Sequence, residues 1–462
     1  MIEKDATILK QYTGPLSRSI QDEYAISPEH YRGDVKLGLR NSDGTGVLVG
    51  VSRVGSVQGY LLQDGQRVPI PGQLYYRGIE LTDIVEAHRR AGTFGFEEVA
   101  YLLLMGYLPS KSELVYFDKI MNQARKLPEG FTEGMIMRHP SRSIMNELAR
   151  SVLSLYSYDP DPDNTSIDNM LLQSVKLIGY FPSIVANAYA VQRHYFHGDS
   201  LHIHYPVPEL STAENFLRMM RPDKSYTDEE AHLLDMMLMV HAEHGGGNNS
   251  TFVCRAMSSS GTDTYSAIAG AVGSLKGPLH GGANAKVMEM FRYVKENVDP
   301  HDDGSIRDYL NKLLDKQAGD RSGKIYGLGH AVYTMSDPRA VLLKKYAQRM
   351  AELKGYADDF ALLQKVEEIG IPLVMERKGS DTPMCANVDM YSGLVYTMLG
   401  IPEEVFTPLF ASARIAGWCA NRIEEVVTCH RIMRPAYRAV TTHEHYVPME
   451  QRGEHLHLTS AE

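Results

Sequence analysis

Apolar and polar positions alternate with helical periodicity over most of the chain from Tyr76 onward. Two of these segments open with a capping box, in which an N-cap Ser or Thr and a Glu three residues later bind each other's backbone N–H. They are Ser110–Glu113 and Thr227–Glu230. We expect the second helix to end at Gly245–Gly247, after an apolar face made by Leu233, Leu234, Met237 and Val240.

Further helices are predicted nearer the C-terminus. The dipeptides Asp337-Pro338 and Thr407-Pro408 each place an N-cap residue before proline, which is favoured at the first helical position. The second of these helices should run to about Val427. Apolar residues at helical spacing predict three more segments, at 265–275, 287–294 and 390–399.

The first 75 residues have a different pattern. They are rich in Gly, Val, Ser and Asp, and short apolar runs alternate with turn residues, which predicts strands. We expect turns at Asp64-Gly65 and Pro71-Gly72. The sequence therefore predicts a mainly α-helical protein with a short β element near the N-terminus. Turn-rich stretches at 299–304 and 377–383 bracket a candidate smaller subdomain.

Composition and charge narrow the function classes. The 462 residues include 47 Lys and Arg against 57 Asp and Glu, a net charge of −10. This charge argues against general nucleic-acid binding, which needs cations to replace phosphate counterions, although an arginine cluster in one cleft can still bind an anionic substrate. Four cysteines without CxxC spacing argue against a disulfide framework or a zinc ribbon. With neither a signal peptide nor an apolar run of about 20 residues, we expect a soluble cytoplasmic protein.

The first candidate site is the segment His241–His244, followed by three glycines and Asn248. A zinc site of the metalloprotease type needs histidines four positions apart with Glu directly after the first, and this spacing fails. A histidine near a helix C-terminus can also be placed there simply because its positive charge is favourable. The triple glycine nonetheless lets a ligand approach the backbone closely, with His244 and Asn248 offering hydrogen bonds.

Two further histidines lie in glycine-rich loops. His280, within GPLHGGAN, precedes a helix whose positive end would lower its pKa and keep it a neutral donor for a developing enolate oxygen, unless it is only a turn residue. His330, within GLGH, precedes Arg339 in the first turn of the next helix. A guanidinium and free backbone N–H groups there would form a carboxylate site, although an arginine at such a position is often only a surface residue.

Three more charged residues are candidates. Asp389 is either an N-cap residue or, in a cleft, a carboxylate general base. Arg414 lies beside Trp418 in an apolar segment, where an unpaired charge is costly, so that it needs an anionic partner. Arg434, which precedes Pro435, could reach out from near the chain end.

Two other motifs are set aside. The segment 319–324 resembles a P-loop, but it has too few residues between its glycines and lacks a Ser or Thr after the lysine. Four histidines of the C-terminal tail could bind a metal, but a solvated terminus is favoured; they are His443, His445, His455 and His457.

The order of the motifs resembles that of the citrate synthase family: HAEHGGGN, GPLHGGAN, GLGHAVYTMSDPR, NVDMYSG, FASARIAGW and RPAY, preceded by LYYRGIEL and FEEVAYLLLMGYLP. The resemblance covers about residues 75–437. It implies a multi-helical homodimer, or a larger dimer-based oligomer, in which a small domain closes over the cleft. We accordingly expect an N-terminal β-rich extension at 1–75 and a discontinuous large helical domain made of 76–284 and 390–440. A small mobile domain is expected at 285–389, and a C-terminal tail at 441–462.

The resemblance also implies an activity, the condensation of acetyl-CoA with oxaloacetate as in the tricarboxylic acid cycle, followed by thioester hydrolysis to citrate and CoA. It implies neither a permanently bound cofactor nor a metal. Asp389 matches the base that removes the acyl α-proton, His280 the donor to the enol(ate) oxygen, and His330 the donor to the oxaloacetate carbonyl. The matches to oxaloacetate-binding residues are His244, Asn248, Arg339, Arg414 and Arg434, the last contributed by the neighbouring subunit.

The chain departs from the family pattern where contacts to the CoA nucleotide are expected. Many bacterial relatives carry basic residues one and four positions after the loop histidine, where this chain has Ala331 and Thr334. Relatives also carry an aromatic residue and then proline where this chain has Cys385-Ala386. The substitutes we consider for CoA contacts are Lys324, Arg377 and Lys378.

Three alternatives stay open at this point. A 2-methylcitrate synthase would use propionyl-CoA by the same mechanism, and dual specificity is plausible because one methylene changes binding by only about 1–3 kcal/mol. An inactive homologue with a regulatory role is the second, although the joint retention of Asp389, His280 and His330 speaks against it. A metal-dependent enzyme is the third, and insensitivity to EDTA would remove it.

Overall fold

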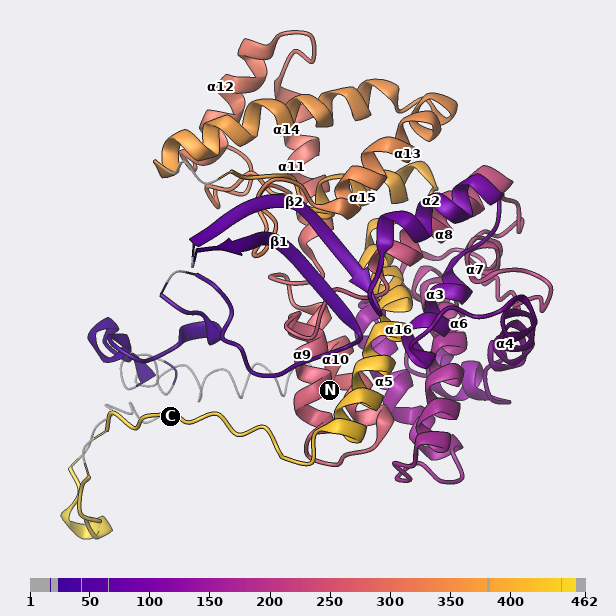
Figure 1. Ribbon diagram of the computed structural model, residues 1–462, viewed down its shortest axis with the longest axis horizontal. Helices are drawn as coiled ribbons and strands as arrows, with labels where there is room; N and C mark the ends of the chain where they lie inside the picture. The colour runs from indigo at the N-terminus through magenta and orange to yellow at the C-terminus, as the bar shows by residue number, and fades with distance from the viewer. Residues whose placement is uncertain are drawn as a thin grey trace, which may run out of the picture. The chain divides into compact units, whose positions relative to one another are not determined.

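The structure is a computed structural model that describes residues 17, 24–42, 44–64, 66–379, 383–441 and 443–453. The chain forms two compact units. One is Gly50–Met433, and the other combines Met1–Val49 with Arg434–Glu462. The larger unit holds the helices α2 to α16 and the strands (Figure 1), so the prediction of a mainly α protein with a short N-terminal β element is confirmed.

The helices of the larger unit follow one another along the chain after the three strands. They are α2 (Leu81–Ala91), α3 (Phe96–Met105), α4 (Lys111–Ala124), η3 (Thr132–Met137), α5 (Ile144–Leu155), η4 (Tyr156–Tyr158), α6 (Ile167–His197), α7 (Thr212–Met220), α8 (Asp228–His241), α9 (Asn249–Ser258), α10 (Thr264–Lys276), α11 (Ala283–Asn297), α12 (Asp303–Leu314), α13 (Pro338–Lys354), α14 (Ala357–Lys378), α15 (Asp389–Met398) and α16 (Glu403–Thr428). The smaller unit contains the short helices η1 (Pro28–Tyr31), η2 (Leu37–Leu39) and η5 (Met449–Gln451).

Local sequence explains where several helices begin. Ser110 and Thr227 open α4 and α8 with complete capping boxes, as predicted. Asp337 caps α13 and accepts a hydrogen bond from a backbone N–H of the first turn, with proline at the first helical position. The helices predicted through 265–275 and 287–294 are α10 and α11. The helix α8 ends at His241, short of the glycine run that was expected to end it.

The predicted start of α16 at Thr407-Pro408 is wrong. The helix begins at Glu403, with Pro402 as its N-cap residue, and Pro408 lies inside it. Two acidic residues in the first turn favour the earlier start because they interact with the positive end of the helix dipole. Pro408 then removes only one backbone hydrogen bond near the helix start.

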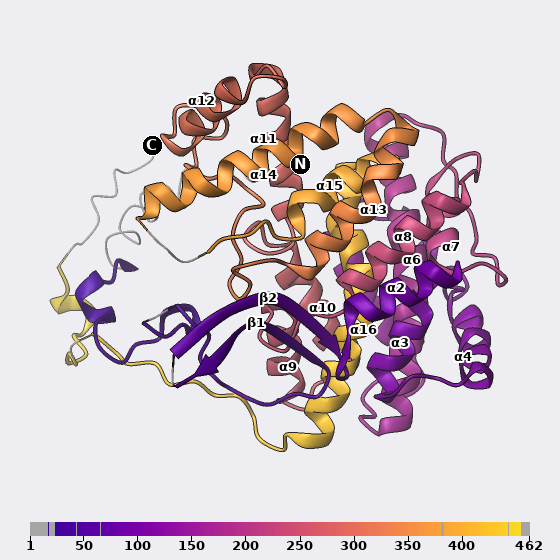
Figure 2. The ribbon, with the colours of Figure 1, turned by 45° about the horizontal axis from the view of Figure 1, so that its top comes forward.

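The three strands form one antiparallel sheet in the order β1 (Gly55–Gln63), β2 (Gln66–Tyr76) and β3 (Ile79–Glu80). The β1–β2 turn begins at Asp64, as predicted, and Gly65 lies outside the described residues. Figure 2 shows that both long strands are curved.

The turn predicted at Pro71-Gly72 is wrong, because both residues lie within β2. The pairing shifts register between Gln58 and Tyr60, opposite this proline. Such an irregularity tolerates a residue without an N–H, since the regular ladder is already interrupted there.

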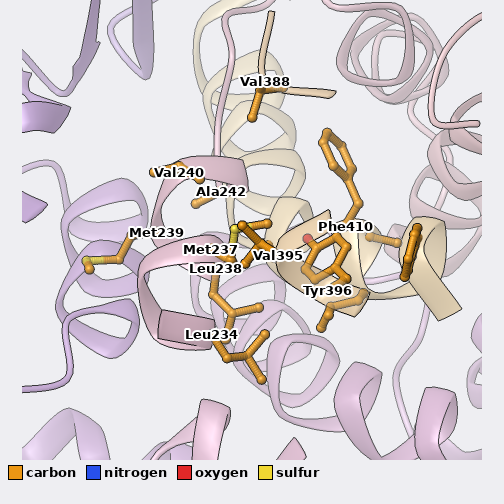
Figure 3. Close-up of a cluster of buried hydrophobic side chains, with 14 of the residues drawn as sticks. Leu234, Met237, Leu238, Met239, Val240, Ala242, Val388, Val395, Tyr396 and Phe410 are labelled. Atoms are coloured by element: carbon orange, nitrogen blue, oxygen red, sulfur yellow. The ribbon is translucent and has the colours of Figure 1, made fainter. Parts of the chain in front are cut away.

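A hydrophobic cluster joins α8, α15 and α16 (Figure 3). The helix α8 is buried on all sides over its second half, as expected of a helix at the centre of a core. Its Leu234 and Leu238 gather with Val395 and Tyr396 of α15 and with Phe410 of α16. This packing fixes the three helices relative to one another at the place where each approaches the candidate site.

In the part of the chain that the structure describes, no helix is long and apolar enough to cross a membrane. The domain boundaries predicted at residues 75, 284, 389 and 440 stay predictions.

Candidate active site

Six of the predicted site residues interact electrostatically or through ring contacts within the larger unit. The ring centroids of His244 and His330 lie 5.2 Å apart, in an edge-to-face arrangement. The pKa of His244 is far below its ordinary value, chiefly because the ring is buried and also because positive groups surround it. The charged groups Arg339 and Arg414 act on both His244 and Asp389. The set that the structure brings together is His244, His280, His330, Arg339, Asp389 and Arg414.

Backbone hydrogen bonds hold the loop before His330 against the segment before Asp389. The N–H of Gly329 donates to the carbonyl O of Cys385 at 2.8 Å, and the N–H of Asn387 donates to the carbonyl O of Gly327 at 2.9 Å. The side chain of Asn387 adds a hydrogen bond from Nδ2 to the carbonyl O of Gly329 at 2.8 Å. A short two-stranded bridge therefore sets the spacing of His330 and Asp389.

Asp337 connects this bridge to the first arginine. Its carboxylate accepts hydrogen bonds from Nε and Nη2 of Arg339, at 3.0 Å and 2.7 Å, and from the backbone N–H of Val388 at 3.2 Å. Burial works against the positive charge of Arg339, but the Asp337 carboxylate outweighs it and raises the pKa of the guanidinium. Arg339 is therefore charged and held rigidly by a bidentate pair, beside the residue that precedes Asp389.

His330 has a defined tautomer. The backbone N–H groups of Val332 and Tyr333 point at its Nδ1, at 3.0 Å and 3.1 Å. A backbone N–H always carries its hydrogen, so Nδ1 is the acceptor and the ring proton of the neutral imidazole is on Nε2. The Tyr333 ring also stacks on the imidazole, with the ring centroids 4.6 Å apart.

His280 has the opposite tautomer. The backbone N–H of Ser250 points at its Nε2 at 3.3 Å, which assigns the ring proton to Nδ1 by the same reasoning. The Ser250 hydroxyl lies 2.9 Å from the same nitrogen and is contacted by Trp418 Nε1 and by the side chain of Asn248. Burial, and secondarily the charge of Arg414, lower the pKa of His280 to about 4. The imidazole is therefore a neutral hydrogen-bond donor at neutral pH, as predicted, although burial contributes most to this shift.

Arg414 is fully buried and only partly satisfied. Its Nε donates to the carbonyl O of His241 at 2.6 Å, and its guanidinium lies over the Phe410 ring, 4.6 Å from the centroid. Among the described residues, its Nη1 and Nη2 have no hydrogen-bond partner, and neither has Nε2 of His244. Burial lowers the pKa of Arg414 to about 10, so that it is still a cation at neutral pH. These three buried nitrogen atoms thus have no hydrogen-bond partner among the described residues. The oxygen atoms of an anionic ligand could accept hydrogen bonds from them.

Asp389 is the first residue of α15 and not its N-cap residue, which is Val388. Its carboxylate is half-buried, and burial raises its pKa to about 6, against the opposing effect of Arg339. A carboxylate whose pKa lies near neutrality is suited to take a proton from a weak carbon acid. The N-cap interpretation is therefore wrong, and the placement favours the general-base interpretation.

The structure does not bring the other predicted residues into this set. Arg434 is exposed and belongs to the smaller unit. Arg377 is paired with Asp315 and Asn311. Lys324 is exposed and borders a small cavity, and Lys378 is the exposed last residue of α14. Their assignment to CoA stays a prediction.

The metal-site hypothesis concerns the described histidines and carboxylates. Within residues 17, 24–42, 44–64, 66–379, 383–441 and 443–453, no group of three or more His, Cys, Asp or Glu side chains is arranged to hold a metal ion. His443 and His445 are in the described tail, and His455 and His457 lie outside it.

Two functional residues were missed by the sequence reasoning. Ser250 orients His280, and Tyr333 contacts both His330 and His244. Ser250 lies two residues after the end of the quoted motif HAEHGGGN, so the motif could have been extended to it. Nothing local distinguishes Tyr333 from an ordinary loop tyrosine.

The chain is similar in sequence to several known proteins. A family model described as "Citrate synthase, C-terminal domain" matches residues 43–436. A citrate synthase of Deinococcus radiodurans is 36% identical over 360 residues, covering 77% of this chain and 88% of that protein. A 2-methylcitrate synthase of Shewanella oneidensis is 31% identical over 363 residues, covering 79% and 87%.

A solved structure extends the likeness to the fold. It is the ternary complex of carboxymethyl coenzyme A and oxaloacetate with the citrate synthase of Thermoplasma acidophilum. The likeness has a TM-score of 0.74 at 26% identity and covers 91% of this chain and 100% of that one. The sequence motifs, the helical architecture and these matches agree, and the chain belongs to the citrate synthase family.

Proposed function

We propose that this protein condenses acetyl-CoA with oxaloacetate and hydrolyses the resulting thioester, giving citrate and CoA. One observation carries the proposal. The terminal nitrogens of Arg414 and the Nε2 of His244 are buried without an acceptor among the described residues, beside a carboxylate whose pKa is raised to about 6. A dicarboxylate substrate would satisfy the donors, and the carboxylate would act as base.

The first step is enolisation. The Asp389 carboxylate takes a proton from the methyl carbon of acetyl-CoA, and the electron pair of the broken C–H bond moves onto the thioester oxygen. The Nδ1–H of His280 donates a hydrogen bond to that oxygen. A neutral donor at a developing enolate stabilises charge that is absent from the ground state, which is how such a group lowers the barrier.

The second step forms the carbon–carbon bond. The enolate carbon attacks the keto carbon of oxaloacetate, and the Nε2–H of His330 donates a hydrogen bond to the carbonyl oxygen as it becomes an alkoxide. This oxygen takes up a proton to give the tertiary alcohol, which balances the proton that Asp389 removed from the methyl carbon. Arg339, Arg414 and His244 hold the carboxylates in place. Attack of water on the thioester carbonyl then expels CoA as the thiol and leaves citrate.

The alternative substrate is propionyl-CoA, because relatives of both specificities match this chain to a similar extent. We would measure the release of CoA thiol by purified protein, with oxaloacetate and matched concentrations of acetyl-CoA or propionyl-CoA. A higher kcat/KM for acetyl-CoA supports the citrate synthase proposal, and a preference for propionyl-CoA assigns the protein to 2-methylcitrate synthesis. Folded protein that is silent with both would favour the inactive homologue.

The proposed active form is a homodimer in which Arg434 completes the oxaloacetate site of the neighbouring subunit. Arg434 is exposed, and it stands in the RPAY motif where the family resemblance implies this role. We also propose a cytoplasmic location, which agrees with four cysteines that are all free thiols.

A further inference from the structure

The hairpin of β1 and β2 (residues 55–76, called the hairpin below) touches the two segments that carry His244 and His330. A Cβ added to Gly55 would lie 2.8 Å from Cγ of Glu243, and Val57 Cγ2 is 3.2 Å from the Cβ position of Gly245. The hairpin thus packs against the segment around His244. It also packs against residues 330–336, called the His330 loop.

Gly72 makes the closest approach to the His330 loop. Its N–H donates to both the carbonyl O and the Oγ of Ser336, each at 3.1 Å. A Cβ at this position would lie 2.1 Å from the Ser336 carbonyl O and 2.6 Å from Cδ1 of Tyr333, where ordinary contacts begin at 3.4 Å. A glycine within a strand often marks such a close approach of another backbone, and here no larger residue fits without displacing the loop.

The Tyr333 ring transmits this contact to His330. It lies against Gly72 on one side and stacks on the His330 imidazole at an interplanar angle of 24°. The backbone N–H of Tyr333 is one of the two that bind His330 Nδ1. The described His330 loop contains neither helix nor strand, so its position depends on the elements that it touches.

We propose that Gly72 is a positioning residue for His330. The hairpin holds the His330 loop in the arrangement in which the ring and the N–H of Tyr333 fix the imidazole with its proton on Nε2. Gly59 supports the loop from the same hairpin, because its Cβ position lies 2.4 Å from the carbonyl O of Val332. The proposal rests on the role given to His330 in the proposed function, and it assigns the N-terminal strands a part in polarising the oxaloacetate carbonyl.

The test is the variant Gly72→Ala in the full-length protein. Its Cβ forces a displacement of roughly 1 Å, and a misplacement of that size can lower catalysis by about 100-fold. We expect kcat to fall by about that factor, with the KM for acetyl-CoA little changed. We also expect the infrared carbonyl stretch of bound oxaloacetate to move back toward its frequency in solution. The control is Gly134→Ala, since a Cβ there meets nothing within 4 Å.

The carbonyl band separates positioning from mere structural support. The proposal is overturned if folded Gly72→Ala protein has the same kcat as the wild type. It is also overturned if kcat falls while the carbonyl band stays where it is in the wild type. If Gly72→Ala does not fold, Ser336→Ala carries the test, because it removes the Oγ acceptor without adding bulk. We expect a smaller shift of the band in the same direction, and an unchanged band overturns the proposal. Wild-type protein that neither releases CoA nor shifts the band overturns the proposed function itself, before any variant is compared.

Discussion

The raised pKa of Asp389 predicts how activity depends on pH. With a pKa of about 6, the carboxyl is about nine-tenths ionised at pH 7 and about one-tenth ionised at pH 5. An ordinary carboxyl with a pKa of 3.8 would be more than about nine-tenths ionised at both. Since only the carboxylate can take the proton, we expect kcat/KM to fall about tenfold between pH 7 and pH 5.

The assay follows the loss of thioester absorbance with limiting acetyl-CoA and saturating oxaloacetate, in buffers of constant ionic strength. His280 does not titrate in this range, because its pKa is lowered to about 4. Asp235 does titrate in this range, because burial raises its pKa to about 7. Its carboxylate, however, accepts hydrogen bonds from the backbone N–H groups of Gly95 and Phe96 at the start of α3 and has a structural role. The variant Asp235→Asn should therefore show the same fall of kcat/KM between pH 7 and pH 5.

Two results would refute the reasoning. One is a profile that is flat from pH 7 to pH 5, and the other is a profile that bends only near pH 4. Circular dichroism at each pH must show that the protein is still folded, since loss of fold would produce a similar fall for another reason.

Three further predictions concern charged residues of the site. Asp389→Asn should abolish turnover and leave oxaloacetate binding, measured by calorimetry, nearly intact; wild-type turnover would reject the base assignment. The raised pKa of the carboxyl stabilises the folded state fully below pH 3.8, and this contribution is lost as the pH rises through about 6. The variant should therefore also have a higher Tm than the wild type at pH 7. Arg414→Met should weaken oxaloacetate binding by about 100-fold. It should not lower the Tm of the free enzyme, because it removes a buried charge with unpartnered nitrogens; unchanged affinity would contradict its role. Mixed dimers of Arg434→Ala and Asp389→Asn subunits should regain some activity at one site, and verified heterodimers without recovery would exclude a contribution from the neighbouring subunit.

Local sequence predicted the starts of several helices, because such start signals act over a few residues. The caps at Ser110, Thr227 and Asp337 need only the first turn of each helix. Two of the three proline signals, Thr407-Pro408 and Pro71-Gly72, failed because a competing feature decided the outcome. Acidic residues upstream of Thr407 extended α16, and the register shift of the sheet accommodated Pro71 within a strand.

The sequence predicted which residues gather at the candidate site better than it predicted their geometry. The motif order identified His280, His330 and Asp389, but their proton positions depend on Ser250 and on the N–H groups of the His330 loop. The contact between Gly72 and Ser336 joins residues 264 positions apart. Periodicity and spacing carry no information about such a pair, since it forms only when the whole larger unit is folded.

The bridge between residues 327–329 and 385–387 has a consequence for divergence within the family. Two of its hydrogen bonds join backbone atoms only, and they close a segment that contains α13 and α14. Side chains along the bridge can therefore be exchanged in evolution without altering the spacing of His330 and Asp389. Cys385 and Ala386 lie in the bridge itself, and Ala331 follows directly after His330. The spacing of the proposed catalytic residues is thereby insulated from exchanges of the neighbouring side chains.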